Sequence, residues 1–254
     1  MWHDTWLIFK RGMVLSLRNP VWVVITMMQP ILYLVLFGPL MEKITKTPGF
    51  PPGSSWQILT PALLVQLGLF GSAFVGFGLI AEYRAGVIER MRVTPASRVG
   101  LLLGRVLRDA VQLVVQAILI TVLSIVVFWL RAPFWGNVFS LVMVLLLGIT
   151  MSASSYALAL ILKSEDAFAP LLNSVLLPVL LLSGIMIPIT TGLAPSWLYW
   201  ISRVNPFTHV VDAERAGFRG DFALSAIMTG SIVLVVLAAL SVFWGARTFQ
   251  RESG

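Results

Sequence analysis

Charged residues are scarce in this chain of 254 residues, and cysteine is absent. Asp, Glu, Lys and Arg together make up 11% of the sequence, whereas a soluble domain carries about 25%. An ordinary soluble domain is therefore excluded. Without cysteine, the chain has no disulfides, thiol nucleophiles or cysteine metal sites. Its two histidines, His3 and His209, are too few for paired haem ligation.

Motifs for nucleotide binding and hydrolysis are also missing. The chain contains no G-x-x-x-x-G-K-[ST] loop to hold ATP phosphates, no H-E-x-x-H and no G-x-S-x-G. An aspartate-rich cluster for Mg-diphosphate chemistry is likewise absent. If ATP drives this protein, another chain must supply the ATP site. We expect no cofactor or metal on this chain, and we do not expect it to be an enzyme by itself.

One grouping of polar residues could suggest a catalytic or metal site. Ser202, His209 and Asp212 lie close in the sequence, as a hydrolase triad would require, and Glu214 could join His209 and Asp212 on a weak metal site. Ordinary polar residues on a helix at the membrane surface are the better explanation.

Long apolar runs dominate the sequence, which is 58% hydrophobic and has a mean hydropathy of +0.91. Runs of about 18 apolar residues mark membrane-spanning helices, and each run here can cross a hydrocarbon core about 30 Å thick. The sequence therefore predicts an all-α membrane protein with one continuous domain over residues 1–254. Six spans are expected, at residues 21–40, 57–81, 107–130, 136–161, 167–187 and 224–246.

Residues 1–19 predict a helix that lies in the membrane interface rather than a seventh span. Its apolar residues recur at helical spacing and its charged residues fall off that face: Trp2, Trp6, Phe9 and Met13 against Asp4, Lys10 and Arg11. This amphipathic pattern is typical of interfacial helices.

The distribution of Lys and Arg predicts the orientation. Twelve of the 18 fall on the side of the membrane that carries both termini, and six fall on the other side. Because cytoplasmic loops carry the excess of Lys and Arg, we expect both termini in the cytoplasm of a multi-pass protein of the cell (plasma or inner) membrane. The net charge of +7 then reflects topology and contact with membrane lipid, and no nucleic acid partner is expected.

The densest group of charges lies between spans 2 and 3. Residues 82–109 read EYRAGVIERMRVTPASRVGLLLGRVLRD and hold nine of the 29 charged residues. Thr94 and Pro95 suit a helix start, since threonine caps a first turn and proline at the first position loses no needed hydrogen bond. Arg105 and Asp109, four residues apart, are expected to pair on one helix face.

The residues alone leave two interpretations of this loop open. Its arginines could simply fix the topology and contact lipid phosphates. Alternatively, a short helix with Val87, Ile88 and Met91 on one side, ringed by both signs of charge, could dock a cytosolic partner. Glu82 and Glu89 favour docking, because attraction to lipid has no use for acidic residues.

This loop and a later segment together resemble a known family. The motif ERMRVTP precedes span 3, and residues 181–218 read LLSGIMIPITTGLAPSWLYWISRVNPFTHVVDAERAGF. With the basic N-terminal helix and six spans, the layout resembles the permease subunits of type-2 ABC exporters, the group that contains daunorubicin-resistance permeases and polysaccharide exporters. The later segment is similar to that family's SG…P…P…NP pattern, at Ser183, Gly184, Pro188, Pro195, Asn205 and Pro206.

The resemblance implies a coupling helix in the loop at residues 82–106 that sits in a cleft of a separate ATPase subunit. The implied coupling residues are Gly86, Val87, Ile88, Glu89, Arg90, Met91, Arg92, Thr94 and Pro95. Among these, the resemblance makes Glu89, Arg90, Arg92 and Thr94 the polar contacts. It further implies a homodimer of permeases that works with two copies of the cytosolic ATPase, which bind ATP and Mg.

The resemblance also implies an external gate at residues 188–223. Pro195 can begin one short helix there, and Asn205 can cap a second helix that opens with Pro206. In the family, such external helices dip back toward the pathway. From the residues alone, an amphipathic loop that rests on lipid explains the segment equally well.

Spans 2 and 5 of two copies line the central path in that family, which makes four residues candidates for contact with cargo: Gln66, Phe70, Phe74 and Asn173. Hydrogen bonds between helices are the alternative role for the two amides. Elsewhere in span 2, a small-residue stripe at Gly68, Ser72 and Gly76 predicts close helix packing.

The expected function is the transmembrane permease subunit of an ATP-driven exporter. Its cargo is expected to be a lipophilic or amphipathic, drug-like small molecule, with a polysaccharide or lipid-linked glycan as the alternative. An ion-coupled transporter or channel would need charged groups in mid-span. The sequence shows none in spans 1, 2, 4, 5 and 6, and Asp109 lies near the expected cytoplasmic end of span 3. An intramembrane enzyme would need convergent titratable groups, which are also lacking.

Overall fold

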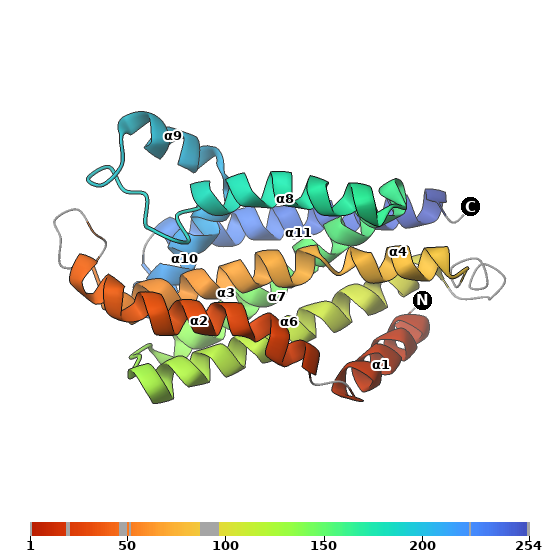
Figure 1. The fold of residues 1–254 in the computed structure, drawn as a ribbon, viewed down its shortest axis with the longest axis horizontal. Helices are drawn as coiled ribbons and strands as arrows, with labels where there is room; N and C mark the ends of the chain where they lie inside the picture. The colour runs from red at the N-terminus through yellow and green to blue at the C-terminus, as the bar shows by residue number, and fades with distance from the viewer. Residues whose placement is uncertain are drawn as a thin grey trace.

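The computed structural model describes residues 2–18, 21–45, 50, 52–86, 97–223 and 225–252, and within these ranges it contains helices and no strand (Figure 1). The predicted all-α class is confirmed. The helices are α1 (Trp2–Arg18), α2 (Val21–Ile44), α3 (Ser55–Ala73), α4 (Gly76–Arg84), α6 (Arg98–Phe128), α7 (Phe134–Leu162), α8 (Glu165–Leu182), α9 (Ser196–Val204), α10 (Pro206–Arg219) and α11 (Ser225–Glu252). Residues 87–96, which hold most of the expected coupling helix, lie outside the described residues.

In the described part of the chain, six segments are long and apolar enough to cross a membrane, as the sequence predicts: Val23–Ile44, Ser55–Arg84, Arg98–Phe128, Phe134–Leu162, Glu165–Leu182 and Ser225–Arg251. The third begins well before the expected residue 107. Ser97 is its N-cap, and the Ser97 hydroxyl accepts a hydrogen bond from the Gly100 amide at 3.1 Å. The expected helix start at Thr94 and Pro95 lies outside the described residues.

The second span, predicted at residues 57–81, consists of two helices, with a break between α3 and α4. Ser155 of α7 bridges the break. Its hydroxyl donates to the Ala73 carbonyl at 2.5 Å and accepts from the Gly76 amide at 2.9 Å. Backbone groups inside a membrane that lose their helical hydrogen bonds need other partners in the protein. The Ser155 hydroxyl supplies such partners and so stabilises the break. A Cβ at Gly76 would lie 2.5 Å from Cζ of Phe168 and 2.8 Å from the Ser155 carbonyl oxygen, so glycine is required there.

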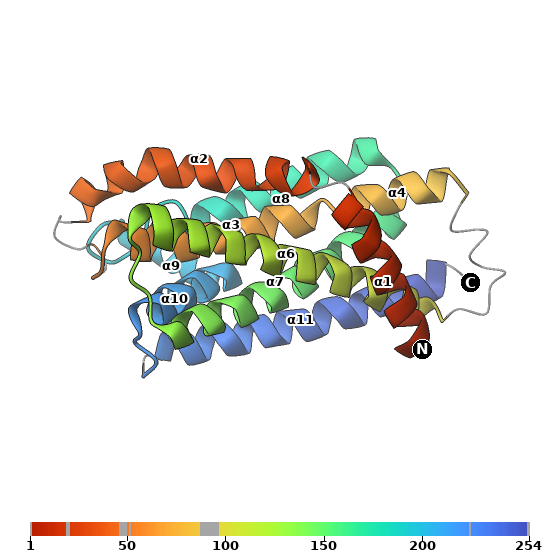
Figure 2. The same ribbon diagram turned by 90° about the horizontal axis from the view of Figure 1, so that it is seen from below.

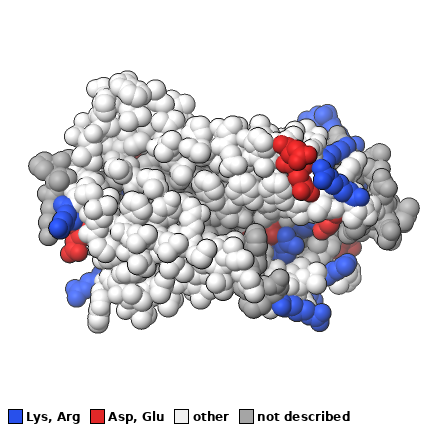
Figure 3. Space-filling view, viewed as in Figure 1, with Lys and Arg blue, Asp and Glu red and all other residues white. Residues whose placement is uncertain are grey.

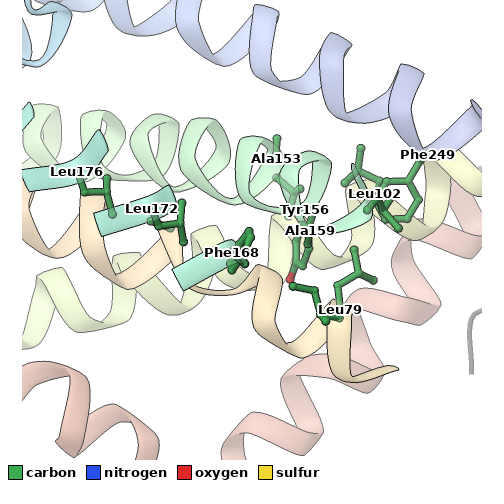
Figure 4. Close-up of a cluster of buried hydrophobic side chains, with 13 residues drawn as sticks. Leu79, Leu102, Ala153, Tyr156, Ala159, Phe168, Leu172, Leu176 and Phe249 are labelled. Atoms are coloured by element: carbon green, nitrogen blue, oxygen red, sulfur yellow. The ribbon is translucent and has the colours of Figure 1, made fainter. Parts of the chain in front are cut away.

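Helix α7 lies at the centre of the bundle, with α3, α6 and α11 packed around it (Figure 2). A Cβ at Gly68 would lie 2.2 Å from Cδ2 of Leu147, which confirms the close helix packing predicted from the small-residue stripe and shows that α7 is the partner helix. Toward one end of α7, a buried cluster joins α4, α6, α7, α8 and α11 (Figure 4), and includes Leu79, Leu102, Tyr156, Phe168 and Phe249.

Both termini lie at one end of the bundle, here called the termini end (Figure 1). Most of the charged side chains visible on the face in Figure 3 also gather at this end. Helix α1 packs on the first part of α6 and crosses the direction of the long helices at a steep angle (Figure 2). Asp4 of α1 accepts a hydrogen bond from the Ser97 amide at 3.2 Å, which fixes α1 to the start of α6.

Candidate functional site

Two adjoining cavities lie along α2 and α3, and α1, α4 and α6 also line the second. The first contains three of the four predicted path residues. This aromatic cavity has a volume of about 300 Å³ and is lined by Ile25, Thr26, Gln29, Pro30, Gln66, Leu67, Phe70, Gly71 and Phe74. Gln66, Phe70 and Phe74 succeed one another at four-residue steps, so they share one helix face. Asn173, the fourth candidate, is exposed on α8 and lines neither cavity.

Gln66 offers an unused hydrogen-bond acceptor beside the aromatic cavity. Its side chain is 2% exposed, and its Oε1 has no hydrogen-bond partner among the described residues. A buried acceptor without a partner costs about 1–3 kcal/mol. A ligand hydroxyl or N–H group that entered the cavity could recover that free energy.

The second cavity, here called the polar cavity, has a volume of about 380 Å³ and shares Thr26, Gly71 and Phe74 with the first. Its remaining polar lining comes from Ser16, Ser72, Arg108, Asp109, Gln112 and Gln116. Gln116 Nε2 donates to Thr26 Oγ1 at 2.9 Å and so ties α6 to α2. The two cavities form an amphipathic groove with an aromatic end and a charged end.

A partly buried ion pair between Arg108 and the buried Asp109 forms the charged end of the groove. Oδ1 of Asp109 accepts from Arg108 Nε at 2.8 Å and Nη2 at 2.6 Å, and its Oδ2 accepts from the Tyr156 hydroxyl of α7. These partners offset the loss of hydration that burial imposes on the carboxylate. The predicted pair between Arg105 and Asp109 is wrong, because Asp109 faces α7 while Arg105 pairs with Glu82 of α4.

Two of the predicted signature residues end α8. Ser183 is the C-cap residue, and its hydroxyl donates to the Leu180 carbonyl at 2.8 Å. Gly184 follows with a φ of +72°, a left-handed conformation that favours glycine. Pro188, a few residues on, is buried, whereas Pro195 is exposed and directly precedes α9.

Asn205 and Pro206 begin α10, as the sequence predicts. Asn205 Oδ1 accepts from the Phe207 amide at 3.1 Å, and its Nδ2 donates to the Val179 carbonyl of α8 at 2.8 Å. Thr208 Oγ1 makes a second link, with the Leu182 carbonyl at 3.1 Å. Asn205, which caps α10, and Thr208 in its first turn therefore join α10 to the last turn of α8.

Arg215 is a central residue of this region whose role the sequence pattern does not indicate, because its position predicts only a charge beyond the membrane. It is 4% exposed, and its guanidinium donates to the carbonyls of Ile58 at 3.2 Å and Gly184 at 2.8 Å. It thus joins α10 to α3 and to the segment after α8. Burial lowers its pKa to about 10, so it remains charged at neutral pH. The apolar residues Val211 and Phe218, on the same helix face, were the available signal.

Glu214, the neighbouring residue, is fully buried and neither carboxyl oxygen has a hydrogen-bond partner among the described residues. Burial raises its pKa from 4.5 to about 8. The nearby Ser140 hydroxyl acts in the opposite direction, and burial outweighs it. A buried carboxyl group without partners is favoured in its neutral form.

The candidate triad and metal ligands do not converge. The Ser202 hydroxyl donates to the Tyr199 carbonyl at 2.7 Å, and Asp212 pairs with Arg203 at 2.6 Å. His209 Nε2 contacts the Arg203 carbonyl at 3.1 Å. Over the described ranges, no three His, Asp or Glu side chains gather in a group that could hold a metal ion.

Known proteins resemble this chain over most of its length. Residues 3–219 match the ABC-2 type transporter family. The chain is 25% identical over 248 residues to the daunorubicin resistance ABC transporter permease protein DrrB1 of Streptomyces coeruleorubidus, which covers 94% of this chain and 82% of that protein. It is 27% identical over 214 residues to the putative transport permease ycf38 of Cyanophora paradoxa, which covers 84% of this chain and 73% of that protein.

The family match runs from α1 to the end of α10, so it includes the amphipathic groove, the loop between α4 and α6, and the signature residues. The resemblance first suggested by ERMRVTP and the later SG…NP pattern is thereby confirmed. With six helices able to span a membrane, this chain belongs to the ABC-2 type transporter family and is a multi-pass permease subunit of an ABC transporter.

Proposed function

We propose that this permease is the membrane subunit of an ATP-driven exporter, which works as a homodimer with two copies of a separate cytosolic ABC ATPase. Family membership supports the ATPase partner, which would bind ATP and Mg, because this chain has no loop for ATP phosphates. The proposal that the direction of transport is export rests on the similarity to a daunorubicin resistance permease over 94% of the chain. The charged termini end would face the cytoplasm of the plasma or inner membrane.

The proposed cargo is a lipophilic or amphipathic small molecule. The amphipathic groove supports this class, because Phe70 and Phe74 offer flat apolar contact while Gln66 offers a hydrogen-bond acceptor. A polysaccharide would need many polar partners along its path. Among the described residues, Thr26, Gln29 and Gln66 are the only polar ones that line the aromatic cavity, which makes the glycan alternative weaker.

One observation supports an ion-coupled transporter as the second candidate. Because α6 begins at Arg98, Asp109 lies eleven residues along the helix, about 16 Å from its start, and it borders the polar cavity. Both of its oxygens are held by Arg108 and Tyr156, however, so it offers no free carboxylate to an ion path. The exporter remains the better proposal.

The helices α9 and α10 are proposed to form the external gate, together with the signature residues. Asn205 and Thr208 bond to the last turn of α8, so a shift of α8 would be passed to α10. This role rests on the family resemblance and on these two contacts.

The coupling segment is proposed at residues 86–97, and a charge exchange tests it together with the ATPase partner. The chain purified from its native membrane is expected to retain an ABC ATPase whose hydrolysis vanadate inhibits and daunorubicin stimulates. Glu89→Arg combined with Arg92→Glu should leave the chain inserted but abolish the stimulation, because the docking contacts change sign.

A matched control exchanges two exposed charges at the far end of α2, Glu42→Lys with Lys43→Glu, which should leave stimulation unchanged. Undiminished stimulation in the Glu89/Arg92 variant would contradict the coupling segment. Recovery of the chain alone and inert in several detergents would contradict the exporter itself.

Removing the free acceptor in the aromatic cavity tests the cargo site. Gln66→Leu is expected to raise the daunorubicin concentration for half-maximal ATPase stimulation about fivefold, because one ligand hydrogen bond worth about 1 kcal/mol is lost. Asn173→Leu, on the exposed face of α8, serves as the control and should change little. If Asn173→Leu raised this concentration and Gln66→Leu changed it little, the cargo path would lie between two copies of the chain and not in the groove.

A further inference from the structure

A third cavity lies outside the amphipathic groove, between α1, α4 and α6 at the termini end. It has a volume of about 310 Å³ and is rich in arginine, with Arg11 from α1 and both Arg105 and Arg108 from α6. The carboxylate of Glu82, from α4, also lines it. We refer to it as the arginine cavity.

The wall that α1 contributes is fixed by two close glycine contacts with α6. A Cβ at Gly104 would lie 2.8 Å from the Thr5 carbonyl oxygen, and a Cβ at Gly12 would lie 2.5 Å from Cδ of Arg108. The Arg108 side chain therefore runs directly against the α1 backbone. The cavity is thus a consequence of how α1 packs on α6, and not a gap between loosely placed helices.

The guanidinium groups at the arginine cavity have more hydrogen-bond donors than the neighbouring carboxylates accept from. Arg105 bonds to Glu82 through Nη2, and Arg108 bonds to Asp109 through Nε and Nη2. Within the described part of the chain, Nη1 of both arginines makes no hydrogen bond and Arg11 makes no ion pair. Guanidinium groups with spare donors are suited to an acceptor-rich anion.

The charges of this region also point to an anion. Among the described residues, the three guanidinium groups that line the cavity, on Arg11, Arg105 and Arg108, are accompanied by two carboxylates, on Glu82 and Asp109. One positive charge is therefore left unbalanced. Phosphate oxygens match the planar donor fork of arginine and can neutralise this charge.

The remaining walls favour a ligand with an apolar part. Ile8 and Leu15 of α1 and Leu101 of α6 line the same cavity. Helix α1 has the amphipathic pattern typical of a helix at the membrane surface. Basic pockets between helices at that depth bind anionic lipid headgroups. We propose that the arginine cavity binds a phosphate ester, supplied in the membrane by the headgroup of an anionic phospholipid.

Arg108 links this site to the groove, because it lines both the arginine cavity and the polar cavity. A bound headgroup would hold the side chain that forms the charged end of the groove. Lipid binding is independent of whether the protein exports drugs, so the two proposals can fail separately.

Native mass spectrometry of the full chain in neutral detergent tests the site with two lipids, dioleoylphosphatidylglycerol and dioleoylphosphatidylcholine. One phosphatidylglycerol per chain should be retained, and phosphatidylcholine should be lost. Arg11→Gln is expected to weaken phosphatidylglycerol binding about fivefold, the effect of one arginine at a lipid surface. Glu82→Gln should strengthen binding by a similar factor, since it releases Arg105 for the phosphate.

Lys10→Gln is the matched control, since Lys10 is exposed on the same helix and is absent from the cavity lining. It should leave binding unchanged. Equal losses in the Arg11 and Lys10 variants would overturn the proposal, because they would indicate diffuse attraction to the surface. Displacement of the lipid by an equal concentration of glycerol phosphate would support the phosphate site but overturn a lipid as its source.

Discussion

Replacing Arg215 with methionine is expected to lower the thermal unfolding midpoint of the detergent-purified protein by about 5–10 °C, which corresponds to about 2–4 kcal/mol. The Arg215 guanidinium donates to Ile58, Gly184 and Ile185 carbonyls from α3 and from the segment after α8. Methionine fills a similar length but donates no hydrogen bond, so these buried carbonyls lose their donor. We expect α10 to separate from both neighbours, and cargo-stimulated ATPase activity to fall with it.

Arg219→Met provides the matched control on the same helix. Arg219 pairs with Asp221 at 3.2 Å, and the Asp221 side chain is 51% exposed. Exposed ion pairs contribute about 0–1 kcal/mol, so this substitution should shift the midpoint by at most a few degrees. Arg215→Lys should lie between the two, because lysine keeps the charge but has no planar fork to reach two carbonyls. Equal midpoints for the Arg215→Met and Arg219→Met variants would disprove the role assigned to Arg215.

Glu214→Gln is expected to remove a pH dependence of stability that the native protein shows between about pH 4.5 and pH 8. In the folded protein, burial raises the pKa of Glu214 to about 8 from 4.5, so the folded state keeps its proton over a range where the unfolded state loses it. Ionisation then favours unfolding, and stability falls as the pH rises through this range. The full loss, reached near pH 8, is up to about 5 kcal/mol.

The measurement is the unfolding midpoint of the native and Glu214→Gln proteins at several pH values from 5 to 8.5. The two midpoints should nearly coincide at pH 5, and the variant should become progressively more stable above it. Asp221→Asn removes an exposed carboxylate nearby and should show no such divergence. A difference between Glu214→Gln and native protein that stays constant with pH would show that the carboxyl group does not titrate in this range.

Features that depend on local sequence were predicted well. Six apolar runs gave six helices able to cross a membrane, because length and composition decide this property. Asn205 and Pro206 begin α10 as expected, since a cap needs only its own side chain and the next few amides. Gln66, Phe70 and Phe74 share a helix face by spacing alone, and they line one cavity.

The sequence does not predict features that depend on contacts with a second helix. The break in the second span depends on the Ser155 hydroxyl of α7. The sequence of the span alone does not indicate this contact. Arg105 was assigned to Asp109 because they are four residues apart, yet Glu82 of α4 takes Arg105. Asn173 is exposed on α8 and does not line the groove, so its predicted place on a path between two copies stays a prediction.

By itself, the sequence determined the all-α membrane class, the six spans and the family, because apolar length, helix caps and ordered motifs are properties of the chain alone. The tertiary structure decided where charge is buried, at Asp109, Glu214 and Arg215. Whether such a buried group keeps its charge depends on whether another helix supplies partners. Asp109 has partners on α6 and α7, Arg215 has carbonyls from α3 and after α8, and Glu214 has no hydrogen-bond partner among the described residues.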